Sequence, residues 1–174
     1  MHLLHDAMAL IEPSIAAYGA LAVFVVIYFE ALGAPLPGES LLVAVSALAA
    51  RGDINLVHAL VAAFCGAVLG DSTGYAIGHF GGRPLLLRYG HYIKLTPERL
   101  GTLEDVFRRK GMWIVMGARF VAILRQINGL IAGSVAMHWP RFLLANTIGA
   151  AAWVLVWGLG AYAAADGIEV FFRR

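Results

Sequence analysis

Residues 56–80, LVHALVAAFCGAVLGDSTGYAIGHF, decide the fold, because this stretch is long and apolar enough to cross a bilayer yet contains an acid. Glycine recurs at every fourth position of the stretch, which favours close helix–helix contact in lipid along one helix face. These glycines are Gly66, Gly70, Gly74 and Gly78. Asp71 stands four residues before Tyr75 on the same side of the helix. We therefore expect the Asp71 carboxylate to face the interior of a helix bundle rather than lipid.

The composition of the whole chain agrees with a membrane location. Of its 174 residues, 60% are hydrophobic and only 14% are charged, and the mean hydropathy is +0.76. Soluble domains carry about 25% charged residues. The single cysteine, Cys65, excludes an internal disulfide framework. The sequence therefore predicts an integral, multi-pass membrane protein with one domain over residues 1–174.

The segment before the first span, residues 15–50, has a different pattern. Two apolar arms, each shorter than the roughly 20 residues that a spanning helix needs, flank an elbow that contains Pro35, Pro37 and Gly38. This pattern predicts a re-entrant hairpin. Non-helical backbone at membrane depth is tolerated only where protein covers it or where it lines a cavity, so the elbow points to a polar site.

The second half repeats this order. We predict a transmembrane helix over 56–81, a polar basic loop over 83–110 with an interfacial amphipathic helix, a second hairpin over 111–138 and a second transmembrane helix over 141–165. The fold class is thus an all-α membrane protein with two oppositely oriented re-entrant hairpins, each followed by a spanning helix, in the manner of an inverted repeat. The excess of Lys and Arg in the loop predicts that it is cytoplasmic and that both termini lie outside.

Five ionisable residues interrupt the apolar segments: Glu30, Glu39, Asp71, Arg119 and Arg125. One charge at the bilayer centre costs about 2.5–3.5 kcal/mol on insertion scales, which is a large share of a folding stability of about 5–15 kcal/mol. Retaining three acids and two bases is explained if they pair with one another or face a watery cavity. We therefore predict a buried polar site formed by these side chains.

Several separated motifs resemble the DedA family, also described by its VTT domain, over residues 24–157. The motifs are Phe29-Glu30, Pro35-Leu36-Pro37-Gly38-Glu39, the glycine helix with Gly70-Asp71 and Gly74-Tyr75, Gly117-Ala118-Arg119-Phe120, Arg125, Ala132-Gly133, Met137, Phe142, Asn146, Gly149-Ala150 and Trp153. The resemblance implies two re-entrant hairpins of opposite orientation in a bacterial cytoplasmic membrane. It also implies lipid translocation, of undecaprenyl phosphate or another phospholipid, with dependence on the proton motive force in some members.

One position departs from the family pattern. Members commonly have proline three residues after the arginine of the Arg-Phe pair, where this chain has Ala122. We therefore expect the break in the second hairpin to depend on Asn128, Gly129 and Gly133.

The chemistry of the charged residues agrees with transport of a lipid phosphate. Arg119 and Arg125 are expected to bind the headgroup, because a guanidinium stays charged and binds phosphate through two parallel hydrogen bonds. Glu39 and Asp71, with Glu30 in addition, are expected to serve as counter-charges or proton carriers. A carboxylate separated from its arginine in an apolar site favours the protonated form, which would couple phosphate entry to proton uptake.

Other functions also fit the residues. A proton-coupled carrier of a small solute or ion would use the same charges, and a structural scaffold would need only the ion pairs. The sequence has no His/Asp cluster, aspartate array or nucleophile motif of a lipid enzyme, so we expect a non-enzymatic protein without metal, cofactor or nucleic acid. Its expected partners are membrane lipids and protons. The glycine row permits a homodimer and equally permits packing within one chain.

Overall fold

The computed structural model describes residues 18–89 and 96–172, and within these ranges all regular structure is helical. The helices are, in chain order, Tyr18–Leu32, α2 (Gly38–Ala50), α3 (Leu56–Tyr89), α4 (Pro97–Ala118), α5 (Ala122–Ser134), α6 (Trp139–Val154), the π-helical turn η2 (Leu155–Leu159) and α7 (Gly160–Phe172). The predicted all-α class is confirmed for this part of the chain.

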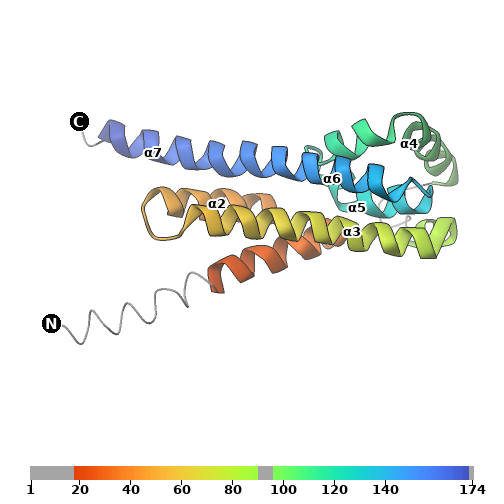
Figure 1. Cartoon of the computed structure of the whole chain (residues 1–174), viewed down its shortest axis with the longest axis horizontal. Helices are drawn as coiled ribbons and strands as arrows, with labels where there is room; N and C mark the ends of the chain where they lie inside the picture. Colours follow the sequence, from red (N-terminus) through yellow and green to blue (C-terminus); the bar gives the residue numbers. More distant parts are fainter. Residues whose placement is uncertain (1–17, 90–95, 173–174) are drawn as a thin grey trace.

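Two long helical rods run along the molecule, and the other helices pack around them (Figure 1). One rod is α3, and the other is the continuous series α6, η2 and α7. Leu56–Gly82 and Trp139–Gly167 are each long and apolar enough to cross a membrane. The two predicted spans therefore exist as helices, and the second extends a few residues beyond its predicted limits at both ends.

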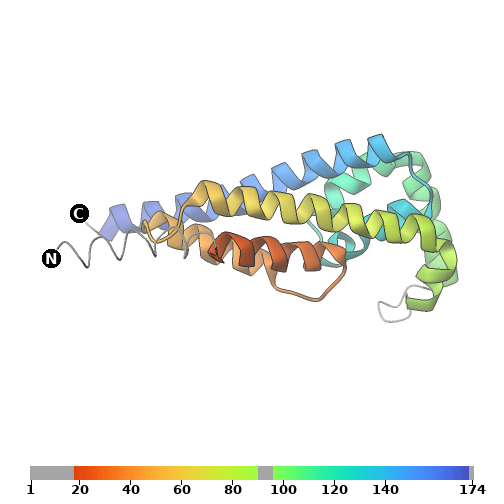
Figure 2. The same ribbon diagram turned by 60° about the horizontal axis from the view of Figure 1, so that its bottom comes forward.

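The shorter helices form two pairs, each joined by a brief elbow. Residues 33–37 connect the helix Tyr18–Leu32 to α2, and residues 119–121 connect α4 to α5. The first pair lies in the half of the molecule that contains α7, and the second lies in the opposite half, beside α6 (Figures 1 and 2). Gly33 has a φ of 120°, a backbone conformation that glycine adopts readily, and it lets the chain turn after the first helix.

The region between the halves differs from the predicted loop. Helix α3 continues to Tyr89 after a kink at Gly82, whose φ is 59°. Pro84, two residues later, is accommodated because it stands at the start of the helical segment that follows the kink. The N–H groups at the start of a helical segment have no partner within the helix, so the N–H that proline lacks is not needed there. The predicted interfacial helix and the first arm of the second hairpin are joined in α4, which is kinked at Lys110. Residues 90–95 lie outside the described residues.

The glycine row of α3 packs against other helices of the same chain, and two different helices contact it. A Cβ at Gly66 would lie 2.6 Å from the Phe24 carbonyl oxygen, whereas a Cβ at Gly78 would collide with the Leu130 carbonyl of α5. A four-residue spacing advances about 40° beyond one full turn at each step. The row therefore winds around α3 instead of keeping to one face, and it packs first against the helix Tyr18–Leu32 and then against α5.

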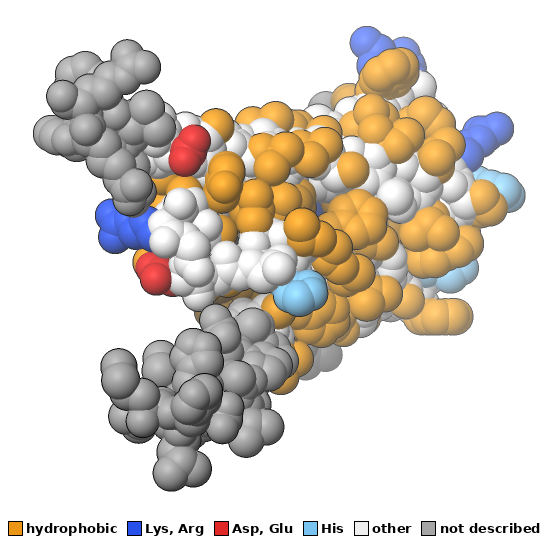
Figure 3. Space-filling model, turned by 60° about the vertical axis from the view of Figure 1, so that its left-hand side comes forward, with side chains coloured by type: hydrophobic (Ala, Val, Ile, Leu, Met, Phe, Trp, Pro, Cys, Tyr) orange, Lys and Arg blue, Asp and Glu red, His pale blue; other side chains and the backbone are white. Residues whose placement is uncertain are grey.

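The surface is apolar over most of its length. Figure 3 shows hydrophobic side chains over the middle of one face, with charged side chains at its margins. Large apolar side chains point outward from both rods, among them Val57, Leu69, Leu144 and Val156. Contiguous exposed apolar surface of this extent is unusual in soluble monomers and agrees with contact to lipid.

Candidate functional site

The five ionisable residues predicted from the sequence meet inside the helical body in two groups. The first group, here called the Arg119 cluster, consists of Arg119, Asp71 and Asn146. The second, the Arg125 cluster, consists of Arg125, Glu30, Glu39 and Trp153. Each cluster centres on one of the two predicted arginines, so the structure pairs every predicted acid with a base.

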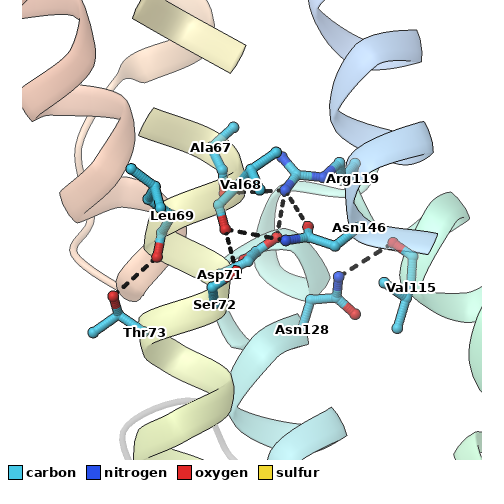
Figure 4. Close-up of polar contacts among 10 residues, drawn as sticks. All are labelled: Ala67, Val68, Leu69, Asp71, Ser72, Thr73, Val115, Arg119, Asn128 and Asn146. Carbon is cyan, nitrogen blue, oxygen red and sulfur yellow. Dashed lines mark hydrogen bonds and ion pairs between the residues drawn. The ribbon is translucent and has the colours of Figure 1, made fainter. Parts of the chain in front are cut away.

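The Arg119 cluster joins the second elbow to both long rods (Figure 4). Arg119 Nη2 donates to Asp71 Oδ2 of α3 and to Asn146 Oδ1 of α6, each at 2.5 Å. The same nitrogen lies 3.1 Å from the Ala67 carbonyl oxygen, and Asn146 Nδ2 donates to the Val68 carbonyl at 3.2 Å. The cluster thus ties the elbow to the middle of α3 and α6.

The Arg125 cluster joins α5 to the first helix pair. Arg125 Nη2 lies 2.6 Å from Glu30 Oε1, and Nη1 lies 3.2 Å from Glu39 Oε2. The guanidinium carbon lies 4.9 Å from the ring centre of Trp153 on α6, in cation–π contact. One arginine fork therefore holds two carboxylates while an indole orients its plane.

The first elbow positions Glu30 by close contact with its backbone. A Cβ at Gly38 would collide with the Glu30 carboxylate, so only glycine allows this approach. Gly38 is the first residue of α2, so its backbone brings the start of this helix against that carboxylate. Pro37 is the N-cap of α2 and has no side-chain oxygen to cap the helix. Glu30 thus fills the role of an N-terminal anion for α2.

The two clusters differ in their access to the outside. The side chains of Arg119 and Asp71 are 1% and 0% exposed. Arg125 and Glu30 are also buried, but the side chain of Glu39 is 39% exposed. The Arg119 cluster is therefore closed in this conformation, whereas the Arg125 cluster can be reached past Glu39.

Both guanidiniums keep an unused donor. Among the described residues, Arg119 Nε, Arg125 Nε and Asp71 Oδ1 are buried without a hydrogen-bond partner in the protein. Buried polar groups are usually hydrogen-bonded, and each exception asks for an explanation. Free donors beside an arginine fork are what an additional oxygen ligand would use.

Two residues of the clusters had no assigned role in the sequence prediction. Asn146 and Trp153 are part of the family pattern in the sequence, but the residue pattern assigns neither of them a function. A polar amide in the middle of an apolar span is costly unless it is bonded, and that signal could have identified Asn146. Nothing in the sequence places Trp153 over Arg125, because the contact depends on how α5 crosses α6.

The expected origin of the second helix break is wrong. Asn128, Gly129 and Gly133 lie inside the continuous helix α5, and the break falls at residues 119–121. Val121 has an extended backbone and is the N-cap, so Ala122 occupies the first helical position. Proline is favoured at that position. Ala122 therefore leaves the elbow in place, because the break precedes it.

Within the described residues, no group of three or more His, Cys, Asp or Glu is placed to hold a metal ion. The carboxylates of both clusters face arginine, and Asn146 accepts from Arg119. The chemistry that these side chains offer is recognition of an anion, together with exchange of protons on the carboxylates.

Comparisons with known proteins agree with this picture of a membrane protein. An uncharacterized membrane protein of Synechocystis is 41% identical over 80% of this chain and 64% of its own length. An uncharacterized membrane protein of Mycobacterium tuberculosis is 39% identical over 85% of this chain and 70% of its own length. The chain thus spans about two thirds of the length of these relatives. No solved structure has a significant match.

One relative carries a functional name. Undecaprenyl phosphate transporter A of Bacillus subtilis is 26% identical over 70% of this chain and 61% of its own length. The VTT domain model matches residues 36–162, which include α2, α3, Arg119, Arg125 and most of the second rod. The chain belongs to the VTT domain family, also known as the DedA family, of membrane proteins.

Proposed function

We propose that this protein moves lipids with a phosphate headgroup across the membrane, and that Arg125 is the residue that first receives the phosphate. The observation that carries the proposal is a buried arginine fork shared by two carboxylates, one of which is 39% exposed. Phosphate and carboxylate use the same two-bond geometry with arginine. An arriving phosphate can therefore take the place of a carboxylate on the fork.

Glu39 is the carboxylate that the phosphate displaces from Arg125. Its contact with Arg125 is the longer of the two, at 3.2 Å against 2.6 Å for Glu30. Glu30 also packs closely against Gly38, and it is buried. The exchange thus leaves Glu30 in place as the resident counter-charge, while Glu39 swings away and phosphate binds Nη1.

The helical architecture supports a path through the membrane. We infer that the two helix pairs enter the bilayer from opposite faces and that their elbows meet near the midplane. A Cβ at Gly33 of the first elbow would lie 3.5 Å from the Gln126 carbonyl oxygen of α5. Arg119 lies in the second elbow. On this proposal Arg119 is a second phosphate ligand, which becomes available when Asp71 and Asn146 release it.

Transport by purified protein in liposomes tests the proposal. The substrates compared are undecaprenyl phosphate, a common phospholipid and a small inorganic anion, each with and without a pH gradient. Arg125→Lys keeps the charge but removes the fork. We expect the rate for the lipid phosphate to fall about tenfold or more, because a charged hydrogen bond contributes about 1.5–3 kcal/mol. The same exchange at an exposed site, Arg51→Lys, is the matched control.

Three results would argue against this function. Wild-type rates in Arg125→Lys would remove Arg125 from the path. Uptake of the small anion without movement of any lipid would favour a carrier of small solutes, which is the competing use of the same charges. Equal loss in Arg51→Lys would show that the effect is not specific to the cluster.

A further inference from the structure

A second positively charged region lies away from both clusters, at the kink of α4. Arg108, Arg109 and Lys110 line a pocket of about 390 Å³ with His138 and Arg141, which come from the start of α6. We refer to it as the basic pocket. Its volume is in the range of small-molecule sites, about 300–1,000 Å³.

The charge of the basic pocket is not balanced by its own lining. Arg108 contacts Asp105 at 3.1 Å, and both side chains are mostly exposed, so this pair contributes little. Among the described residues that line the pocket, none is acidic. Arg109, Lys110 and Arg141 therefore supply a positive excess from two different elements.

The start of α6 contributes side chains to the pocket rather than free N–H groups. Pro140 has no N–H, and the N–H groups of Arg141 and Phe142 donate to the His138 carbonyl oxygen. His138 and Arg141 line the pocket from this helix start. An anion in the pocket would therefore be recognised by cationic side chains.

Neighbouring residues place the pocket at the level of a membrane surface. Trp113 lines the pocket and is 72% exposed, and the nearby Trp139 is 42% exposed. Tryptophan is enriched where hydrocarbon meets headgroups. An apolar groove of about 440 Å³ adjoins the pocket and shares Ala136, Met137 and His138 with it. A charged pocket beside an apolar groove fits a molecule with an anionic head and a hydrocarbon tail better than it fits free phosphate.

We propose that the basic pocket binds the headgroup of an anionic phospholipid of the surrounding leaflet, with an acyl chain along the groove beside Phe80 and Trp139. This site is separate from the Arg125 cluster and does not depend on the transport function. The kink at Lys110 lies within α4, and the segment of α4 that follows it leads to Arg119, the C-cap of the helix. A bound lipid would thus fix the helix that carries the second elbow.

Lipid binding to the full chain in detergent, measured by native mass spectrometry, tests the site. Phosphatidylglycerol and phosphatidylcholine with the same acyl chains are titrated into wild type, Lys110→Gln, Arg141→Gln and the control Arg51→Gln. A basic residue near a membrane surface contributes about 1 kcal/mol to binding of anionic lipid, which is about fivefold in affinity. We expect each pocket variant to weaken phosphatidylglycerol binding about fivefold, without effect on phosphatidylcholine, and the control to match wild type.

Other outcomes would overturn the proposal. Equal affinity of wild type for the two lipids would show that the pocket does not recognise the charge of the headgroup. An equal loss in Arg51→Gln would indicate general surface attraction. Inorganic phosphate that displaces the lipid at similar concentration would assign the pocket to free phosphate. If a variant fails to fold, the salt dependence of lipid binding to wild type still tests the proposal. Raising the salt concentration from about 0.05 to about 0.5 M must weaken binding of phosphatidylglycerol and leave binding of phosphatidylcholine unchanged.

Discussion

The strongest test of the Arg125 cluster compares the same substitution at its two acids. Glu30→Gln and Glu39→Gln each remove one negative charge from one arginine, and they leave the size of the side chain almost unchanged. The two sites differ in burial: the Glu30 side chain is 5% exposed and the Glu39 side chain is 39% exposed. Any difference in stability therefore reports the burial and the contacts of the two sites, because the chemical change is the same.

The expected magnitudes follow from that difference. Removing one partner of a buried ion pair costs about 3–5 kcal/mol, because the remaining charge is left uncompensated. Glu39 still faces Arg125 in the Glu30→Gln variant, so we expect about 3 kcal/mol, the lower end of that range. Glu39→Gln removes a longer, partly solvated contact and should cost about 1 kcal/mol or less. The two variants should thus differ by more than tenfold in the unfolding equilibrium.

Reversible unfolding of the purified protein in mixed detergent micelles, followed by circular dichroism, measures both free energies. The order of the two variants should reverse in transport, where Glu39→Gln alters the rate or its response to a pH gradient while leaving the fold intact. Equal destabilisation by the two substitutions, or a larger effect at Glu39, would refute the assignment of Glu30 as the resident partner.

Three further predictions concern the packing and the elbow. Gly78→Ala should cost about 1–3 kcal/mol in the same unfolding assay, because the added methyl meets α5 backbone; its control, Gly101→Ala, points into open space and should stabilise α4 by up to about 1 kcal/mol. Ala122→Pro should be neutral or raise stability by about 0.4–1 kcal/mol, since the position is the first of α5, whereas Ala132→Pro, inside the same helix, should cost about 3 kcal/mol or more. Tyr75→Phe should lower the free energy of unfolding by about 1 kcal/mol, because the Tyr75 hydroxyl donates to the Met137 carbonyl before α6. Wild-type stability in Tyr75→Phe would contradict this hydrogen bond. Wild-type stability in Ala132→Pro would contradict the continuous helix α5.

The sequence predicted where the helices lie and which residues form the charged site, because both depend on properties of short stretches of the chain. Apolar length predicts a span, and the cost of an unpaired charge in an apolar segment predicts that acids and bases find one another. Both rods and all five ionisable residues are predictable in this way, because neither property depends on how the helices cross.

The pairing within the site depends on that crossing and was not predictable. Glu39 and Asp71 were the favoured counter-charges from the sequence, with Glu30 an addition. In the structure Glu30 makes the shorter contact with Arg125, because Gly38 lets the elbow close onto its carboxylate. The glycine row was expected on one face, but its four-residue spacing winds around α3. In both cases small angular differences, which accumulate over several residues, decide which side chains meet.

The formal charges of the two clusters suggest why a proton would accompany the lipid. The Arg119 cluster pairs one base with one acid, and its third polar partner is the neutral amide of Asn146. The Arg125 cluster holds two acids against one base, so it is already anionic when all three are ionised. A phosphate that enters this cluster adds negative charge to a site of low dielectric, where like charges repel strongly. Protonation of Glu39 as it leaves the arginine would offset one negative charge and so reduce that repulsion. On the proposed function, this surplus acid would couple the movement of phosphate to the movement of a proton.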